Sequence, residues 1–168
     1  SFEHPLDSSN INPSHWVQLA NIIEKQYNHY HGFVVLHGSD TMSYSASALS
    51  FMLENLNKPV IFTGSQLPIG DLRTDAKENL ITSIQLASLH QNNAPVLKEV
   101  GLYFEYKLYR GNRTTKINAD HFEAFASNNF PPLVTSGLKL QIQHDLLLKN
   151  FTQAKLKVHK TLDTNVVL

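Results

Sequence analysis

The sequence predicts an α/β domain of three layers, in which a mostly parallel sheet lies between flanking helices. Two short apolar runs rich in β-branched residues, Phe33–Leu36 and residues 60–62, have the composition of strands buried on both faces. Each run is followed by a longer segment whose apolar residues recur at helical spacing. Strands that alternate with helices in this way form βαβ units, so the sheet is expected to be parallel with right-handed crossovers.

The composition fits one domain with a sizeable core. The chain has 168 residues, of which 42% are hydrophobic and 17% charged, and its formal net charge is zero. A nucleic-acid partner is not expected, because the 14 Lys and Arg residues are scattered and give no basic excess. The lack of cysteine excludes a disulfide framework and a thiolate zinc site. No apolar run could span a membrane and no signal peptide is recognised, so a cytoplasmic protein without a membrane partner is expected.

The first predicted unit is a loop, a helix and a strand. Residues 7–10 are short and polar, and Asn12 followed by Pro13 is typical of a helix N-cap and first turn. The strand Phe33–Leu36 comes after this helix. The helix itself is predicted by an apolar stripe, formed by Trp16, Ala20, Ile23, Tyr27 and Tyr30.

Two further helices flank the second strand. Residues 43–57 carry an apolar face and end at an Asn-Lys-Pro sequence, which stops a helix. After the strand at residues 60–62, Thr74 can cap a helix that extends to about residue 90. Its buried stripe is expected to contain Leu80, Ile84 and Ala87.

The second half of the chain is less regular. A third strand is expected over residues 101–106, leading into a polar turn over residues 109–116. Residues 120–126 are expected to form a short helix, and residues 138–143 alternate as a half-exposed strand does. Residues 1–150 are therefore predicted to form the α/β domain, incomplete at its N-terminus. Residues 151–168 are predicted to form an edge segment and the start of an interdomain connection.

Polar side chains follow each predicted strand. Ser39 and Asp40 come after the first strand, Ser65 and Gln66 after the second, and residues 114–116 after the third. The carboxyl ends of parallel strands share one edge of the sheet, where open α/β sheets bind their ligands. These groups are therefore expected to converge.

Ser39, Asp40 and Lys116 are the candidate reactive groups at this edge. A hydroxyl takes part in catalysis when a nearby base accepts its proton. A lysine whose pKa is lowered by burial can be that base, with a carboxylate to hold it. Two simpler interpretations stay open. Ser39 and Asp40 can cap the following helix, since both residue types are favoured there, and Lys116 can be a solvated lysine in a polar turn.

Other candidate sites are weaker. Arg110 and Arg113 can bind a carboxylate, face solvent, or pair with Asp120 or Glu123. His37 lies in a sequence without the Gly-x-Ser-x-Gly frame of a nucleophile elbow, so a buried, hydrogen-bonded histidine is preferred. The other histidines lack partners at metal-ligand spacing, and no dinucleotide or phosphate loop is present. No metal and no cofactor are predicted.

Several motifs, in the right order, resemble one family. Residues 32–42, G-F-V-V-L-H-G-S-D-T-M, closely resemble the His-Gly-Thr-Asp-Thr-Met signature of bacterial L-asparaginases. The match continues through residues 47–55 (S-A-L-S-F-M-L-E-N), 58–66 (K-P-V-I-F-T-G-S-Q) and 108–116 (L-Y-R-G-N-R-T-T-K). Together these segments are similar to the type I, cytoplasmic branch of the family, and the resemblance extends to about Leu133.

The resemblance implies a hydrolase that converts L-asparagine to L-aspartate and ammonia without a cofactor. In this family a threonine within a Thr-Gly-Gly-Thr-Ile signature forms an acyl-enzyme. A second hydroxyl, an aspartate and a lysine handle protons, and by motif position these are Ser39, Asp40 and Lys116. The resemblance also implies a homodimer or homotetramer whose sites border a neighbouring subunit.

The resemblance assigns substrate-binding residues as well. Asp40 would receive the α-ammonium group of L-asparagine. The loop that holds the α-amino and α-carboxylate groups matches Asp7, Ser8 and Ser9, and the residues near the amide match Ser65 and Gln66.

Two departures from the family pattern matter. The triad threonine is replaced by Ser39, which keeps the hydroxyl but loses the methyl group that restricts its rotamer. The Thr-Gly-Gly-Thr-Ile signature is absent, so the chain is expected to be the middle of the enzyme and to be inactive alone. Two alternatives stay open: an asparaginase-like subunit of a glutamyl-tRNA amidotransferase, and a non-catalytic amino-acid sensor.

Overall fold

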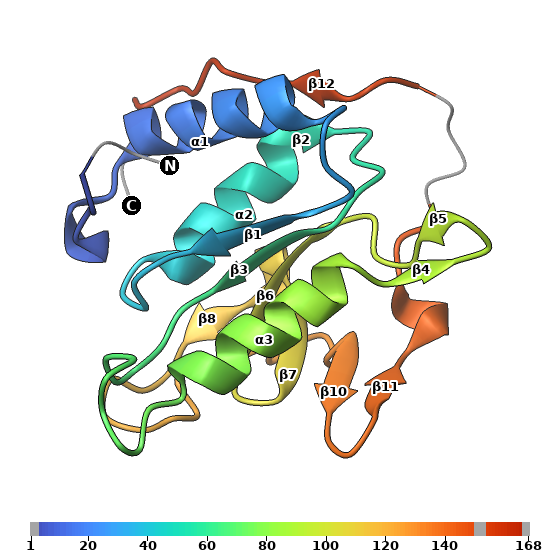
Figure 1. Ribbon diagram of the computed structural model, residues 1–168. Helices are drawn as coiled ribbons and strands as arrows, with labels where there is room; N and C mark the ends of the chain where they lie inside the picture. The colour runs from blue at the N-terminus through green and yellow to red at the C-terminus, as the bar shows by residue number, and fades with distance from the viewer. Residues whose placement is uncertain (1–3, 150–153, 166–168) are drawn as a thin grey trace.

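The structure, a computed structural model, describes residues 4–149 and 154–165. Its centre is a six-stranded sheet with the order β1–β3–β6–β7–β10–β11 (Figure 1). β1, β3 and β6 pair in parallel, β7 is antiparallel to β6, and β10 is antiparallel to β7. Four of the six strands therefore point the same way, and the predicted α/β class is confirmed. The strands are β1 (Phe33–Leu36), β3 (Val60–Thr63), β6 (Val100–Phe104), β7 (Lys107–Arg110), β10 (Val134–Ser136) and β11 (Leu140–Ile142).

Helices cover both faces of this sheet, which gives the predicted three layers (Figure 1). α1 (Pro13–Gln26) and α2 (Met42–Met52) lie on one face, where Leu49 of α2 packs with Phe62 and Leu102. α3 (Ala76–Ala87) lies on the other face, where Leu86 packs with Ile61 and Tyr103. The alternation of side chains along β3 and β6 thus feeds two separate apolar clusters, one for each face.

The start of α1 follows the sequence prediction closely. Asn12 accepts a hydrogen bond from the Ser14 backbone N–H at 3.0 Å, and Pro13 occupies the first helical position. His15 Nδ1 accepts in return from the Asn12 N–H at 3.1 Å, which completes a reciprocal cap. α1 ends at Gln26, so Tyr30 lies beyond it, where its ring meets that of Phe33 edge-on at 6.3 Å.

Two details of the other helices were predicted wrongly. α2 ends at Met52 because residues Leu53–Glu54 form strand β2, which pairs with β12 (Lys157–Val158). On α3, Ile84 is 53% exposed instead of buried. The polar Asn79 takes a buried position in its place, since it donates to the Gly64 carbonyl and accepts from the Glu105 N–H. Because this buried face of α3 contains a polar residue, the helical spacing of apolar residues alone could not identify it.

The third predicted strand is in fact a hairpin. β6 ends at Phe104, and Glu105 and Tyr106, with φ of 43° and 64°, turn the chain straight into β7. Residues 109–110, expected in a polar turn, belong to β7 and return to the start of β6. A short 3-10 helix η2 (Gly111–Arg113) packs against α2, and the chain then turns back toward the carboxyl ends of β1 and β3.

The helix predicted at residues 120–126 does not form. β8 (Thr115–Lys116) pairs instead with β9 (Phe125–Ala126), and the buried ring of Phe125 meets that of Phe104 at 5.0 Å. The half-exposed strand predicted over residues 138–143 is present as β11. The remaining short elements are η1 (Ser8–Asn10), the hairpin strands β4 (His90–Gln91) and β5 (Ala94–Pro95), and η3 (His144–Leu146).

The segment at residues 154–165 lies across the helical layer. Leu156, Val158 and Leu162 pack against the apolar cluster of α1 and α2, and β12 pairs with β2 in a two-stranded sheet separate from the central one. Residues 1–3, 150–153 and 166–168, including the end of the predicted connection, lie outside the described residues. None of the helices within residues 4–149 and 154–165 has the length and apolar character needed to cross a membrane.

Candidate active site

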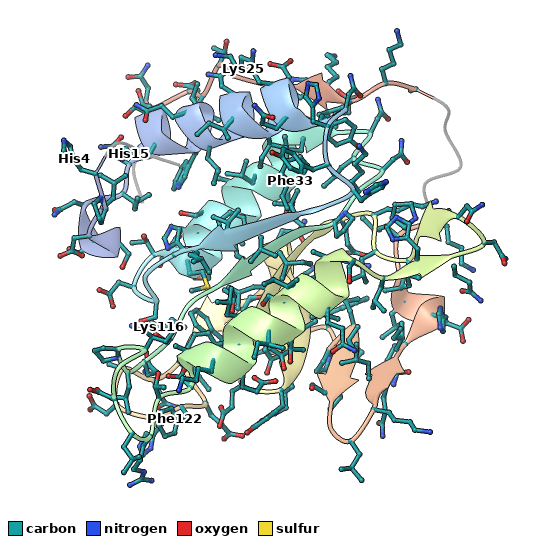
Figure 2. The ribbon with its side chains drawn as sticks, viewed as in Figure 1. His4, His15, Lys25, Phe33, Lys116 and Phe122 are labelled. Carbon is teal, nitrogen blue, oxygen red and sulfur yellow. The ribbon has the colours of Figure 1, made fainter. Side chains whose placement is uncertain are left out.

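Lys116 joins the predicted reactive groups at one edge of the sheet. Its Nζ donates to Ser39 Oγ at 3.1 Å and to Asp40 Oδ1 at 2.7 Å. The lysine side chain is 19% exposed and that of Asp40 is 57% exposed, so the carboxylate remains open to solvent. Figure 2 shows Lys116 beside the loops that follow β1 and β3. The predicted convergence therefore occurs, although Lys116 arrives through η2 and β8 and not directly from a parallel strand.

The turn that carries Ser39 and Asp40 is clamped from one side by residue 8. A Cβ at Gly38 would lie 2.5 Å from Ser8 Oγ, so only glycine fits this position without displacing the loop. Thr41 Oγ1 donates to the Ser8 carbonyl at 2.6 Å. Thr41 is also the residue preceding α2, and no side chain caps that helix. The interpretation of Ser39 and Asp40 as capping residues is therefore wrong.

The loop containing Asp7 and Ser9 is held in a compact turn next to this clamp. The Asp7 carboxylate accepts from the Ser9 N–H at 2.9 Å and from the Ser9 hydroxyl at 2.8 Å. These bonds lower the pKa of Asp7, which is exposed and therefore negatively charged at neutral pH. Ser8 is buried against Gly38. The structure thus brings the predicted substrate loop to the reactive turn.

The loop after β3 lies against the end of β1. A Cβ at Gly64 would collide with the His37 carbonyl, which shows how closely the two chain segments approach. Both carboxylate oxygens of Asp75 accept from the Gln66 N–H at 3.0 Å, and Oδ1 also accepts from the Leu67 N–H at 3.2 Å. Ser65 is half-buried beside them. Asp75, which precedes α3, was missed in the sequence; an acidic residue directly after the predicted cap Thr74 was the only signal.

The Gln66 side chain connects the second loop with the third. Its Nε2 donates to the carbonyls of Ala119 and His121, at 2.9 Å and 3.0 Å. Both acceptors lie in the segment that follows Lys116. Gln66 therefore uses its amide N–H groups to join two loops around the candidate site.

His37 is a hydrogen-bonded histidine, as the sequence indicated, although it is only partly buried. Its Nδ1 lies 2.7 Å from the Gly38 carbonyl and its Nε2 lies 2.8 Å from Ser45 Oγ on α2. Burial lowers the pKa of His37, since the charged ring would lose hydration. Its two ring nitrogens contact these groups and not the Ser39 hydroxyl.

Arg110 serves the structure and not a ligand. Its guanidinium donates to Glu99 at 2.6 Å and to the Leu146 carbonyl at 2.6 Å, and it lies over the Phe130 ring. Arg113 is exposed, at 6.0 Å from the same ring. Glu99, a buried partner before β6, was not anticipated from the sequence. Within residues 4–149 and 154–165, no cluster of His, Asp or Glu could hold a metal ion.

A cavity of about 790 Å³ runs along the free edge of β1. It is lined by the α1 side chains Trp16 and Leu19, by the whole of β1, and by His37 and Gly38 at its end. The cavity therefore leads to the turn that presents Ser39.

Comparison with known proteins gives a consistent result. Residues 1–148 match the family model described as Asparaginase, N-terminal. L-asparaginase 1 of Escherichia coli strain K12 is 53% identical over 136 residues, which are 81% of this chain and 39% of that protein. A mouse protein named 60 kDa lysophospholipase is 47% identical over 163 residues, 97% of this chain and 28% of that protein. The crystal structure of L-asparaginase I from Vibrio cholerae superposes with a TM-score of 0.84 at 43% identity, covering 94% of this chain and 46% of that one. The chain thus spans less than half the length of these relatives.

Proposed function

Since this chain belongs to the asparaginase family, whose N-terminal domain it matches, we propose that the full-length protein hydrolyses L-asparagine to L-aspartate and ammonia. The observation that carries the proposal is the position of Lys116 Nζ, which lies within hydrogen-bond distance of both Ser39 and Asp40. A hydroxyl, an amine and a carboxylate in mutual reach can move a proton to and from a reacting group.

The proposed reaction has two stages. A threonine in a Thr-Gly-Gly-Thr-Ile segment, supplied by the full-length protein, attacks the side-chain amide carbonyl of asparagine. The triad takes up the threonine hydroxyl proton and delivers it to the leaving nitrogen, so the C–N bond breaks, ammonia leaves, and an ester to the threonine remains. Water then attacks the ester, the triad takes up a proton from the water, and this proton returns to the threonine oxygen as aspartate leaves. The cavity along β1 is the place for the segment, because it ends at the turn that bears Ser39.

Ser39, Asp40 and Lys116 have separate roles in this proposal. The Ser39 hydroxyl passes the proton between the reacting groups and the Lys116 amine. Asp40 orients that amine at 2.7 Å through one oxygen, and its exposed side accepts the α-ammonium group of the substrate. Serine in place of threonine at position 39 keeps the proton path while allowing more rotamers.

The substrate-binding loops surround these groups. The charged Asp7 and the neighbouring Ser8 and Ser9 hold the α-amino and α-carboxylate groups of asparagine, which the approach of Ser8 to Gly38 supports. Ser65 and Gln66 lie near the amide in this proposal. Gln66 acts there with its side-chain oxygen and backbone, since its N–H groups bond to the loop after Lys116.

The wider properties of the protein are proposed on the same basis. The reaction needs no cofactor and no metal, because the nucleophile, the proton carrier and the charge partner are all side chains. We expect a cytoplasmic homodimer or homotetramer, which size-exclusion chromatography with light scattering would test. A monomer with full activity would contradict this assembly.

The central test is ammonia release from L-asparagine by the full-length protein and by Lys116→Met. This substitution keeps the length of the side chain and removes its amine, so activity is expected to fall about a hundredfold or more. Lys107→Met is the matched control. This lysine lies on β7, and its ion pair with the exposed Glu123 is long, at 3.8 Å, so the loss of its amine should leave the activity unchanged. Equal activity in Lys116→Met and the unaltered protein would remove Lys116 from the mechanism.

Other outcomes favour other functions. Fatty-acid release from a lysophospholipid without ammonia release would indicate the activity in the mouse relative's name. Ammonia release that depends on a charged tRNA and a partner protein would indicate an amidotransferase subunit. Asparagine binding without hydrolysis would indicate a sensor. Ammonia release by the 168-residue chain alone would contradict a nucleophile from outside it.

A further inference from the structure

We propose that His37 is a positioning residue, which holds the peptide between Gly38 and Ser39 and thereby aims the Ser39 hydroxyl at Lys116. The inference rests on the proposed function for its kinetic test, but its geometry is independent of any substrate. It concerns three residues behind the reactive turn, which belong neither to the triad nor to the substrate-binding loops. These residues are Trp16, Ser45 and His37.

The three side chains form one hydrogen-bonded row across three elements. Trp16 of α1 donates its Nε1–H to Ser45 Oγ of α2 at 2.9 Å. Ser45 Oγ lies 2.8 Å from His37 Nε2, and His37 Nδ1 lies 2.7 Å from the Gly38 carbonyl. The row therefore runs from the outer helix to the backbone of the reactive turn.

The chemistry of the partners fixes where the protons lie. A carbonyl oxygen only accepts, so His37 Nδ1 carries the hydrogen and donates it to Gly38. Because His37 is neutral, its Nε2 has a free lone pair and accepts the Ser45 hydroxyl hydrogen. The indole N–H of Trp16 can only donate, and it occupies a lone pair of Ser45 Oγ. Each group has a partner of the opposite kind, so one tautomer of the ring is selected.

The surroundings leave the His37 ring little freedom to move. Ser45 is buried, and the Phe62 ring of β3 lies 5.9 Å from the imidazole. The backbone N–H of His37 donates to the Thr63 carbonyl at 2.9 Å, which extends the pairing of β1 with β3 by one residue. The ring is thus anchored to the sheet and to α2 before it contacts the turn.

The bond to Gly38 acts on Ser39 because the two residues share a peptide plane. The carbonyl of Gly38 and the N–H of Ser39 belong to one rigid unit. His37 holds this unit by its bond to the Gly38 carbonyl, and Ser8 lies so close to Gly38 that a Cβ there would be 2.5 Å from its Oγ. With the plane fixed, Ser39 Oγ keeps its 3.1 Å distance from Lys116 Nζ. A misplacement of about 1 Å in such an arrangement can cost about a hundredfold in rate.

Two substitutions at position 37 separate positioning from packing. His37→Asn places an amide N–H where Nδ1 stands, so it can still donate to the Gly38 carbonyl. His37→Gln places its amide where Nε2 stands, so it keeps the contact with Ser45 and loses the bond to Gly38. We expect kcat of His37→Asn within about threefold of the unaltered protein and kcat of His37→Gln lower by about tenfold or more, with KM little changed in both. A role in packing alone would favour the larger glutamine.

The matched control is His90→Gln in the same full-length protein. His90 Nδ1 makes the same kind of bond, to the Ser88 carbonyl at 2.8 Å, in the β4–β5 hairpin away from the site. Its kinetic constants are expected to stay unchanged. Equal kcat in His37→Asn and His37→Gln, or a higher kcat in His37→Gln, would overturn the proposal.

A second measurement keeps the inference testable if the variants fail to fold or if no ammonia is released at all. Nitrogen-15 NMR of the unaltered full-length protein reports which nitrogen of His37 carries the hydrogen. The row predicts protonated Nδ1 and unprotonated Nε2 at neutral pH. A ring protonated on Nε2 would overturn the proposal. The absence of ammonia release together with the expected tautomer would count against the proposed function only.

Discussion

Two of the pairs of a cation and a carboxylate whose cation lies in the stretch from β7 to β8 have opposite surroundings. In the first pair, Arg110 Nε donates to Glu99 Oε2 at 2.6 Å, and the two side chains are 14% and 4% exposed. In the second, Lys116 Nζ donates to Asp40 Oδ1 at 2.7 Å, and the carboxylate is 57% exposed. The distances are nearly the same, so the length of the bond does not distinguish the pairs.

The difference lies in how the remaining bonding capacity is used. Glu99 also accepts from the Leu148 N–H at 2.9 Å, and Arg110 also donates to the Leu146 carbonyl. These bonds tie residues 146–148 to the residues next to the start of β6. Lys116 instead donates its second hydrogen bond to the Ser39 hydroxyl, and the Asp40 carboxylate stays open to solvent. A saturated buried pair fixes the chain, whereas an open pair with a hydroxyl can bind a ligand and move a proton.

The largest expected effect comes from breaking the buried pair. Glu99→Ala leaves the Arg110 guanidinium in the protein without its carboxylate, so the free energy of unfolding should fall by ~3–5 kcal/mol. Asp40→Ala should change it by less than ~1 kcal/mol, since that carboxylate is largely solvated. Urea denaturation of the two full-length variants measures both values. Similar losses in the two variants would show that the pairs do not differ in the way proposed.

The open pair was within reach of sequence analysis, and the buried pair was not. Ser39 and Asp40 follow the strand Phe33–Leu36, whose local composition predicts it. Arg110 was assigned several possible partners, all later in the chain, but it pairs with Glu99 because β7 folds back on β6. That hairpin turns at Glu105, which has positive φ although it is neither Gly nor Asn, so the usual turn signal was missing.

The fold shows the same division between local and non-local information. α1, β1 and β3 were predicted from patterns confined to a few neighbouring residues, and their positions agree with the structure. The helix predicted over residues 120–126 failed because Phe125 packs on Phe104, a contact that joins β9 to β6. No local pattern marks such a contact. The position of Lys116, held by the same β8–β9 hairpin, was right even though the route to it was wrong.

An intermediate effect is expected at high pH, through a tyrosine that joins β7 to β9. Tyr109 of β7 donates to the Phe125 carbonyl in β9 at 3.3 Å, and burial raises its pKa to about 12. In the unfolded chain a tyrosine ionises near pH 10. The folded form therefore keeps its proton longer, so this stabilisation is complete below about pH 10 and is lost as the pH rises toward about 12.

Tyr109→Phe tests this dependence on pH. The variant should lose less stability between about pH 10 and 12 than the unaltered protein, because one group with a raised pKa has been removed. Thermal unfolding followed by circular dichroism at several pH values measures the slope. Burial and Glu78 raise the pKa of Tyr103 as well, so some slope should remain in the variant. An identical slope in both proteins would contradict the assignment to Tyr109.

The smallest effect is expected for a third pair of a cation and a carboxylate, whose cation lies on β7. It tests whether burial decides how strongly such a pair is coupled. Lys107 of β7 lies 3.8 Å from Glu123, and the two side chains are 40% and 71% exposed. Solvent screens such a pair, so a double-mutant cycle should give a coupling energy of ~0.2–1 kcal/mol that decreases further in high salt. The same cycle on Arg110 and Glu99 should give a larger value that salt hardly changes, because both side chains are buried. Coupling energies of the three pairs that follow distance instead of burial would contradict this expectation. The exposed Lys116–Asp40 pair, at 2.7 Å, would then be coupled as strongly as the buried pair of Arg110 and Glu99.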